Sequence, residues 1–211
     1  MSRTGLVLAA AAWLAACGEA NVTTFKTVPI SPFMGEPVLG DPKSPVEIIE
    51  YASTTCGHCW ALHEKVMPDL KTAYIDTGKA HLRYRVMPTP PPEISMAGAA
   101  IARCAGEAKF FEVITDLFDH QEQLLGAARS PGRVQQLLVA VGGRHGLTPD
   151  EVGTCINDKA IQAATIKGVA DAPSFVTGTP TLIVNGEVVA EHSLAALSQA
   201  IDARLNAKAA N

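Results

Sequence analysis

Cys56 and Cys59, separated by two residues, are the side chains with the clearest chemistry in the sequence. An apolar run over 46–49 precedes them and a helical repeat begins near Cys59, which places the pair where a buried strand gives way to a helix. At a helix start the first cysteine meets free backbone N–H groups and the positive end of the helix dipole, and both stabilise a thiolate. His58 adds a donor and, when protonated, a positive charge. The pattern predicts that Cys56 is a redox nucleophile and Cys59 its partner in a tight disulfide.

A zinc site and a purely structural disulfide are the alternative interpretations of this pair. A structural zinc ion normally needs four ligands, which usually come from two close pairs, whereas Cys104 and Cys155 each stand alone. A bridge across so short a loop also removes little entropy from the unfolded chain. The spacing therefore favours a redox-active Cys56–Cys59 disulfide that needs neither a metal nor an organic cofactor.

Length and charge limit the classes to which the chain can belong. Its 211 residues suffice for one domain with a substantial core and an insertion. The formal net charge is -4, and no basic stripe with interleaved aromatic residues interrupts it. Nucleic acid is therefore not an expected partner.

The first twenty residues have the composition of a signal peptide. Arg3 is the only charged residue before an apolar run from Leu6 to Ala16, which is too short to span a bilayer. The run ends in a segment similar to the lipobox of bacterial lipoproteins, in which the cysteine, here Cys17, becomes lipidated and N-terminal after cleavage. Ordinary cleavage near Ala20 is the alternative and would discard Cys17. We expect export to the bacterial periplasm, with a membrane anchor if Cys17 is lipidated.

The number of cysteines becomes informative if the chain is exported. Export removes or caps Cys17 and leaves four of the five cysteines, which in an oxidising compartment form two pairs. Cys56–Cys59 is one pair, so Cys104 and Cys155 are expected to form a structural bridge. Such a bridge would close about fifty residues and contribute on the order of 4 kcal/mol if unstrained. Two separate buried thiols are the alternative.

The residues around the cysteine pair have the order of a βαβ unit. The segment 46–51 is apolar and β-branched, as a central strand should be, and 80–87 alternates between apolar and polar residues. A helical repeat runs between them over 59–78, with Pro68 expected to kink it. We expect a right-handed crossover and a short edge strand over 37–40.

Helical periods without a strand signal fill the chain from Ile94 to Val169. Ser130 is expected to cap a helix that starts with a proline, and Thr148 opens a capping box. A strand pair then follows, joined by an Asn185-Gly186 hairpin turn. Further expected elements are helices over 94–105, 110–125, 158–169 and 193–205 and strands over 178–184 and 187–190.

Together these features resemble the thioredoxin superfamily, and within it the DsbA-type thiol:disulfide oxidoreductases of the bacterial envelope. The resemblance is carried by Cys56-Gly57-His58-Cys59, by Glu50 six residues earlier, by Thr179-Pro180 before a late strand, and by the helical block between the two halves. It covers about residues 36–207 and implies an α/β thioredoxin fold, a central mixed β-sheet flanked by helices, with an inserted all-helical subdomain. The expected organisation is a signal peptide over 1–20, a tether over 21–35, a thioredoxin-like domain over 36–88 and 173–208, and the inserted helical subdomain over 89–172.

The resemblance also implies roles for individual residues. In the family the proline that matches Pro180 is cis and lies against the disulfide, and the preceding residue, here Thr179, offers backbone groups to an extended substrate segment. Gly57 and His58 are expected at the same substrate-binding surface. A trans proline on an edge strand is the alternative. The acid that matches Glu50 lies below the buried cysteine in relatives and assists its proton transfer, whereas simple exposure at the sheet rim is the alternative.

As a function, the resemblance implies a thiol oxidase that introduces disulfide bonds into unfolded or reduced exported proteins through Cys56 and Cys59. A membrane protein of the DsbB type would re-oxidise it, and a monomer is expected. Gly57-His58 differs from the Pro-His of the strongest oxidants and is the pair found in eukaryotic protein disulfide isomerases, so an isomerase or reductase is the alternative. A non-catalytic, metal-handling envelope protein is the less favoured second class.

The remaining aromatic and imidazole side chains are expected to have structural roles. Tyr51, Trp60 and the surroundings of Met87 are expected in the core rather than on a binding surface. The other histidines show no ligand spacing and are expected to be solvated or packed; these are His63, His81, His120, His145 and His192.

Overall fold

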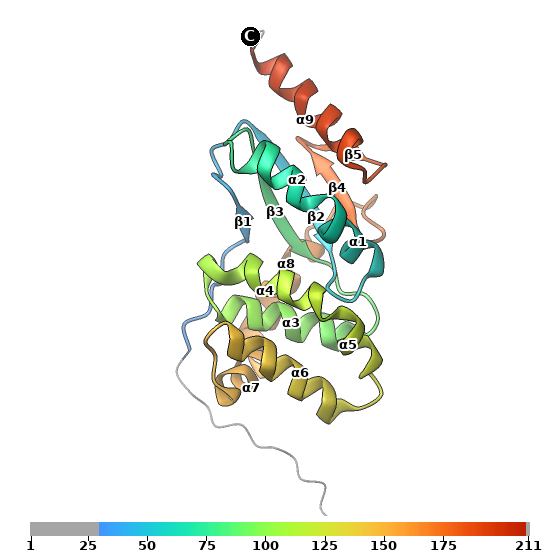
Figure 1. Cartoon of the computed structure of the whole chain (residues 1–211). Helices are drawn as coiled ribbons and strands as arrows, with labels where there is room; N and C mark the ends of the chain where they lie inside the picture. The colour runs from blue at the N-terminus through green and yellow to red at the C-terminus, as the bar shows by residue number, and fades with distance from the viewer. Residues whose placement is uncertain (1–29, 210–211) are drawn as a thin grey trace, which may run out of the picture.

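The computed structural model describes residues 30–209, in which a twisted sheet lies beside a block of helices (Figure 1). The expected signal peptide, Cys17 and the tether up to residue 29 lie outside the described residues. Within 30–209, no helix is both long enough and apolar enough to cross a membrane.

The sheet has an internal strand that ends at the cysteine pair. Its strands are β1 (Val38–Leu39), β2 (Val46–Ala52), β3 (Ala80–Val86), β4 (Thr181–Val184) and β5 (Glu187–Val189). They lie in the order β1-β3-β2-β4-β5, with β2 parallel to β3 and the other neighbours antiparallel. The central place of β2 suits its buried, β-branched sequence. The mixed sheet and its flanking helices confirm the predicted thioredoxin-like α/β fold.

The crossover from β2 to β3 is helical but interrupted. It consists of α1 (Gly57–Lys65), α2 (Met67–Leu70) and a π-helical turn, η1 (Lys71–Ile75). The interruption falls at Val66, and Pro68 then lies in the first turn of α2, where its missing N–H costs no helical hydrogen bond. Buried Leu62 and Leu70 pack in the same core as Ile48 of β2. The kink predicted from Pro68 is therefore present, two residues before the proline.

Between β3 and β4 the chain is entirely helical, and these helices form the lower part of Figure 1. Their buried side chains, such as Ile101, Leu117 and Val152, form a core that also includes Cys59 and Tyr84 from the βαβ unit. The helices are α3 (Pro92–Cys104), the 3-10 turn η2 (Glu107–Lys109), α4 (Phe110–Asp119), α5 (Gln121–Gly126), α6 (Pro131–Arg144), α7 (Pro149–Asn157) and α8 (Lys159–Ala170). The inserted helical block agrees with the predicted fold class, whereas its expected boundaries at 89 and 172 stay a prediction.

Two details of the helical block correct the sequence analysis. The single helix expected over 110–125 is divided at His120 into two helices. The repeat of apolar residues continues across the division, so it did not indicate the break. Ser130 precedes α6 but its side chain makes no capping hydrogen bond. The capping box at Thr148 is present, with Thr148 and Glu151 each accepting from the other's backbone N–H.

The C-terminal hairpin and helix complete the sheet side of the molecule. Asn185 and Gly186 both have positive φ angles, 44° and 88°, as a tight hairpin turn between β4 and β5 requires. Ser193 then accepts from the N–H of Ala196 and begins α9 (Leu194–Ala209). Leu197 and Ile201 of α9 are fully buried in the core that contains β2.

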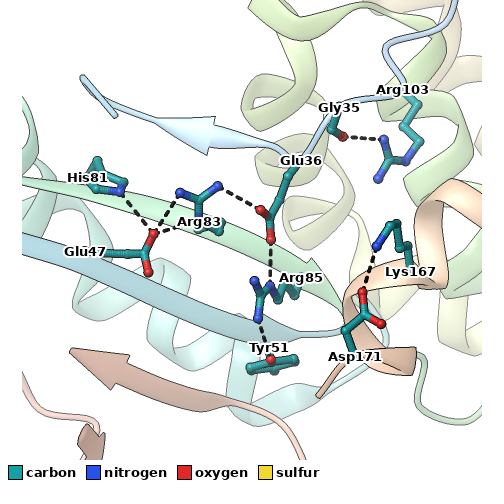
Figure 2. Close-up of polar contacts among 10 residues, drawn as sticks. All are labelled: Gly35, Glu36, Glu47, Tyr51, His81, Arg83, Arg85, Arg103, Lys167 and Asp171. Carbon is teal, nitrogen blue, oxygen red and sulfur yellow. Dashed lines mark hydrogen bonds and ion pairs between the residues drawn. The ribbon is translucent and has the colours of Figure 1, made fainter. Parts of the chain in front are cut away.

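The N-terminal segment is held by ionic contacts, which Figure 2 shows. Glu36 accepts from Arg83 and Arg85 of β3 at 2.7 Å each, and Arg83 also reaches Glu47 at 2.8 Å. Arg103 of α3 donates to the carbonyl groups of residues 33 and 35. The last residues of the expected tether are therefore docked against α3, and Glu36, which follows them, is docked against β3.

A disulfide joins Cys104 at the end of α3 to Cys155 in α7. The two cysteines are 51 residues apart in the sequence, and Cys155 is fully buried. This is the pairing that the cysteine count predicts.

Candidate functional site

The site is built on the turn from β2 to α1. Cys56 is the N-cap of α1 with extended backbone angles, and its Sγ accepts from the N–H of Cys59 at 3.4 Å. The Cys56 thiol donates to the carbonyl oxygen of Thr179 at 3.4 Å. Both cysteines are free thiols; Cys56 is half-buried and Cys59 is buried. Only the first sulfur is therefore accessible to an incoming partner.

Opposing effects determine the acidity of Cys56. Burial by itself raises the pKa of its thiol, because a thiolate loses hydration there. Donors that can reach the thiolate, namely the Thr179 side chain and the N–H groups of Cys59 and His58, act in the other direction. Together they hold the pKa of Cys56 below its usual value. The Thr179 hydroxyl is buried and has no hydrogen-bond partner within residues 30–209 in the thiol form, which leaves it available to the thiolate.

The pKa of Cys59 is shifted in the opposite direction. Desolvation raises the pKa of the Cys59 thiol well above its usual value, and the charges of Cys56 and Glu50 raise it further. A hydrogen bond from the Ser53 backbone only partly opposes this. In the reduced protein the two sulfurs are therefore unequal: Cys56 ionises at a lower pH than an ordinary cysteine, and Cys59 keeps its proton to a higher pH.

The loop before β4 lies directly against Cys56. The Thr179–Pro180 peptide bond is cis, and Pro180 is buried. Thr181, which opens β4, pairs with Tyr51 near the end of β2, so the register places the loop beside the cysteine turn. Thr179 thereby presents its carbonyl group to the reactive sulfur, at the position where the resemblance places an extended substrate segment.

Glu50 lies beneath the cysteine pair rather than at the rim of the sheet. It is fully buried, and His63 of α1 contacts its carboxylate with an Nε2–Oε1 distance of 3.1 Å. The imidazole of His63 packs on Phe118 of α4 with ring centroids 4.3 Å apart. A buried carboxylate needs such a partner, since an unpaired one would be strongly destabilising. Within residues 30–209, His63 is the only side chain that hydrogen-bonds to Glu50. The helical block helps to hold His63 in place through Phe118.

His63 is packed, which is one of the two outcomes expected for it, but the sequence analysis did not identify its contact with Glu50. His81 contacts Glu47 on the sheet, while His120 and His145 both contact Asp116. Among residues 30–209, no group of three or more His, Cys, Asp or Glu side chains is placed to hold a metal ion.

Trp60 corrects a second expectation. Tyr51 is fully buried as predicted, but 38% of Trp60 is exposed. Trp60 lines a cavity of about 630 Å³ together with His63 and Phe111, because this face of α1 borders a hollow that α4 and the edge of the sheet also line. The exposed indole therefore lies on a surface one residue away from Cys59.

Gln121 is a further residue that the sequence analysis did not identify. Its side-chain amide donates to the carbonyl oxygens of Thr54 at 2.9 Å and Cys56 at 3.1 Å. The amide is buried at the start of α5. Nothing in the spacing of Gln121 indicates this contact, since 65 residues separate it from Cys56. Through Gln121 the helical block fixes the backbone of the active-site turn.

Gln121→Leu is expected to lower the free energy of unfolding by about 1–3 kcal/mol, because it leaves a buried carbonyl without its donor. Gln123→Leu is the matched control, since Gln123 is exposed on the same helix. Chemical denaturation of both variants measures the difference. Equal midpoints for the two variants would show that the amide contributes nothing to holding the turn.

Comparison with known proteins agrees with this geometry. The family model described as thioredoxin matches residues 34–203. A protein of Rickettsia conorii named "Putative protein-disulfide oxidoreductase" is 34% identical over 171 residues, which are 80% of this chain and 60% of that protein. A protein of the same name from Rickettsia felis is 33% identical over 80% of this chain and 59% of its own length. The chain thus spans about 60% of the length of the curated relatives it matches.

Solved structures show the same fold. Alpha-DsbA1 of Wolbachia pipientis superposes with a TM-score of 0.70 at 27% identity, over 83% of this chain and 93% of that one. A structure titled protein-disulfide isomerase, from Novosphingobium aromaticivorans, superposes with a TM-score of 0.65 at 24% identity, over 82% and 98% of the two chains. With the family model covering most of its length, the chain belongs to the thioredoxin family and has the fold of the DsbA-type proteins.

Proposed function

We propose that this protein is a thiol:disulfide oxidoreductase that introduces disulfide bonds into exported proteins. The single observation that carries the proposal is the unequal pair of sulfurs: Cys56 is accessible, at a helix N-terminus and with a lowered pKa, whereas Cys59 is buried with a raised pKa. A stable Cys56 thiolate is a good leaving group and favours the dithiol form, which makes the disulfide form an oxidant.

The proposed reaction begins with the Cys56–Cys59 disulfide. A substrate thiolate attacks Cys56 Sγ and forms a mixed disulfide, while the S–S bond to Cys59 breaks and Cys59 leaves with the electron pair and takes up a proton. Glu50, buried beneath the pair, is the group placed to pass that proton. A second substrate thiolate then attacks the substrate sulfur and releases the Cys56 thiolate. The substrate loses two electrons and the enzyme gains them.

The same proposal includes the substrates, the electron acceptor and the location of the protein. The substrates are unfolded or reduced chains that lie as an extended segment against Thr179 and Pro180. A quinone-linked membrane protein of the DsbB type accepts the two electrons from the reduced Cys56 and Cys59 and thereby re-forms their disulfide. The protein acts as a monomer in the bacterial periplasm, and it is anchored to the membrane if Cys17 carries a lipid.

A disulfide isomerase or reductase is the second candidate, because Gly57-His58 is not the dipeptide of the strongest oxidants. Equilibration with defined ratios of reduced and oxidised glutathione separates the two. A reduction potential near about -120 mV supports the oxidase, and one near about -270 mV would defeat it in favour of a reductase.

The pH dependence of that potential tests the unequal sulfurs directly. Above the lowered pKa of Cys56 and below the raised pKa of Cys59, reduction takes up two electrons but one proton. The potential should then fall by about 30 mV per pH unit, and by about twice that below the pKa of Cys56, where both sulfurs are protonated. The lowered pKa stabilises the reduced form above that pKa, and this advantage is lost as the pH falls through it. A steep slope that continues up to the ordinary pKa of a cysteine thiol, about 8.5, would contradict the assignment.

A further inference from the structure

A groove beside Cys56 is lined by one face of α1 and by the loop before β4. It has a volume of about 390 Å³, and Thr179 and Pro180 form one of its sides. From α1 it includes His58 and Lys65, seven residues apart and therefore on one face of the helix. His192, from the loop between β5 and α9, completes it. The groove thus begins at Thr179, which contacts Cys56, and extends along the helix to Lys65.

The charged side chains of this groove all have one sign. Lys65 is positive, His58 and His192 become positive when protonated, and no carboxylate lines the groove. Within residues 30–209 none of these three side chains takes part in an ion pair or hydrogen bond. Lys71 and Lys167, by contrast, each form an ion pair, with Asp76 and Asp171.

The opposite side of α1 has the reverse character. The cavity of about 630 Å³ beside Trp60 is lined by four carboxylates and one lysine, which are Glu64, Glu107, Glu112, Asp119 and Lys71. The chain as a whole has a net charge of -4. The groove beside Cys56 therefore carries positive charge although the chain as a whole is negatively charged.

We propose that the preferred substrates are reduced segments that carry an aspartate or glutamate about three residues from the reacting cysteine. Lys65 follows Cys56 by nine residues, or about 13 Å along α1, and three residues of an extended segment (about 10 Å) together with the length of the two charged side chains cover that distance. A segment that lies extended beside Thr179 with its sulfur at Cys56 then places a carboxylate within reach of Lys65. This inference rests on the proposed function and names the substrate class of the same site.

The test uses cysteine-pair peptides that differ in one residue. Their oxidation by the oxidised full-length protein is followed at low ionic strength, with Glu, Gln or Lys three residues before or after the reacting cysteine. We expect kcat/KM to be about fivefold higher for the better Glu peptide than for its Lys counterpart, and the ratio to shrink in high salt. Lys65→Gln should bring the ratio close to one, and Lys65→Glu should invert it.

The matched control is Lys159→Glu, which makes the same change of net charge at an exposed position on α8. It should leave the Glu-to-Lys ratio unchanged. If a substitution also changes the reactivity of Cys56, it changes the rates of both peptides equally, and the Glu-to-Lys ratio is not affected. Similar rates for all peptides, or a ratio that Lys65→Glu does not alter, would overturn the inference while the proposed function stands. Failure to oxidise any peptide would overturn the proposed function and this inference with it.

Discussion

Cys59→Ala is expected to convert the protein into a trap that holds substrates through Cys56. With a peptide whose cysteine is activated as a mixed disulfide with a chromogenic thiol, the Cys56 thiolate attacks the peptide sulfur and the chromogenic thiol leaves. In the unaltered protein Cys59 then attacks Cys56 and releases the peptide. Without Cys59 that step has no nucleophile, so the Cys56–peptide disulfide should persist for orders of magnitude longer. Intact-protein mass spectrometry after acid quenching measures the trapped fraction.

Cys56→Ala is the complementary variant and should have no turnover. Cys59 would remain, but it is buried and its raised pKa keeps it protonated at neutral pH, and a thiol is a poor nucleophile. The same peptide should therefore form an adduct far more slowly than it does with Cys59→Ala. Sustained thiol oxidation by Cys56→Ala would show that the roles of the two sulfurs are wrongly assigned.

The main-chain architecture was largely predictable because it depends on local signals. The apolar run of β2, the alternation in β3 and the Asn185-Gly186 turn each determine an element from neighbouring residues alone. Where such a signal is ambiguous the prediction failed. The apolar repeat passes through His120 without interruption, so it could not indicate where α4 ends. A serine before a proline is equally compatible with a cap and with the uncapped geometry that Ser130 adopts.

Contacts between distant elements explain what the sequence analysis missed at the site. The motif identifies Cys56 and its neighbours because they are consecutive, whereas Gln121 and His63 reach the site from other turns of the chain. Trp60 shows the same limit, since helical periodicity gives the face of a residue but not which neighbour covers that face. The helical block is thus more than an insertion: it supplies Gln121 to the active-site turn and Phe118 to the partner of Glu50.

The second large effect is expected from the Cys104–Cys155 disulfide. The bridge closes a loop of 51 residues, and in the chain-entropy description a loop of that size stabilises the folded state by about 4 kcal/mol. It also joins α3 to α7, inside the block that holds Gln121 and Phe118 in place. Cys104→Ala combined with Cys155→Ala should therefore lower the free energy of unfolding by about this amount. Urea denaturation under oxidising conditions measures it.

Cys56→Ala combined with Cys59→Ala provides the matched control for this loss of stability. Each pair contains one fully buried and one half-buried cysteine, so the packing lost on truncation is similar. The Cys56–Cys59 bridge closes only a very short loop, however, and its removal should change the unfolded-state entropy far less. A clearly larger loss of stability in the first double variant than in the second then reports the constraint of the long loop. Because Cys104 and Cys155 lie away from the β2–α1 turn, the first double variant should keep most of its thiol–disulfide exchange in conditions where it is folded. Loss of exchange in the folded variant would mean that electrons pass through this second pair, and equal stability of the two variants would show that the bridge does not constrain the unfolded chain.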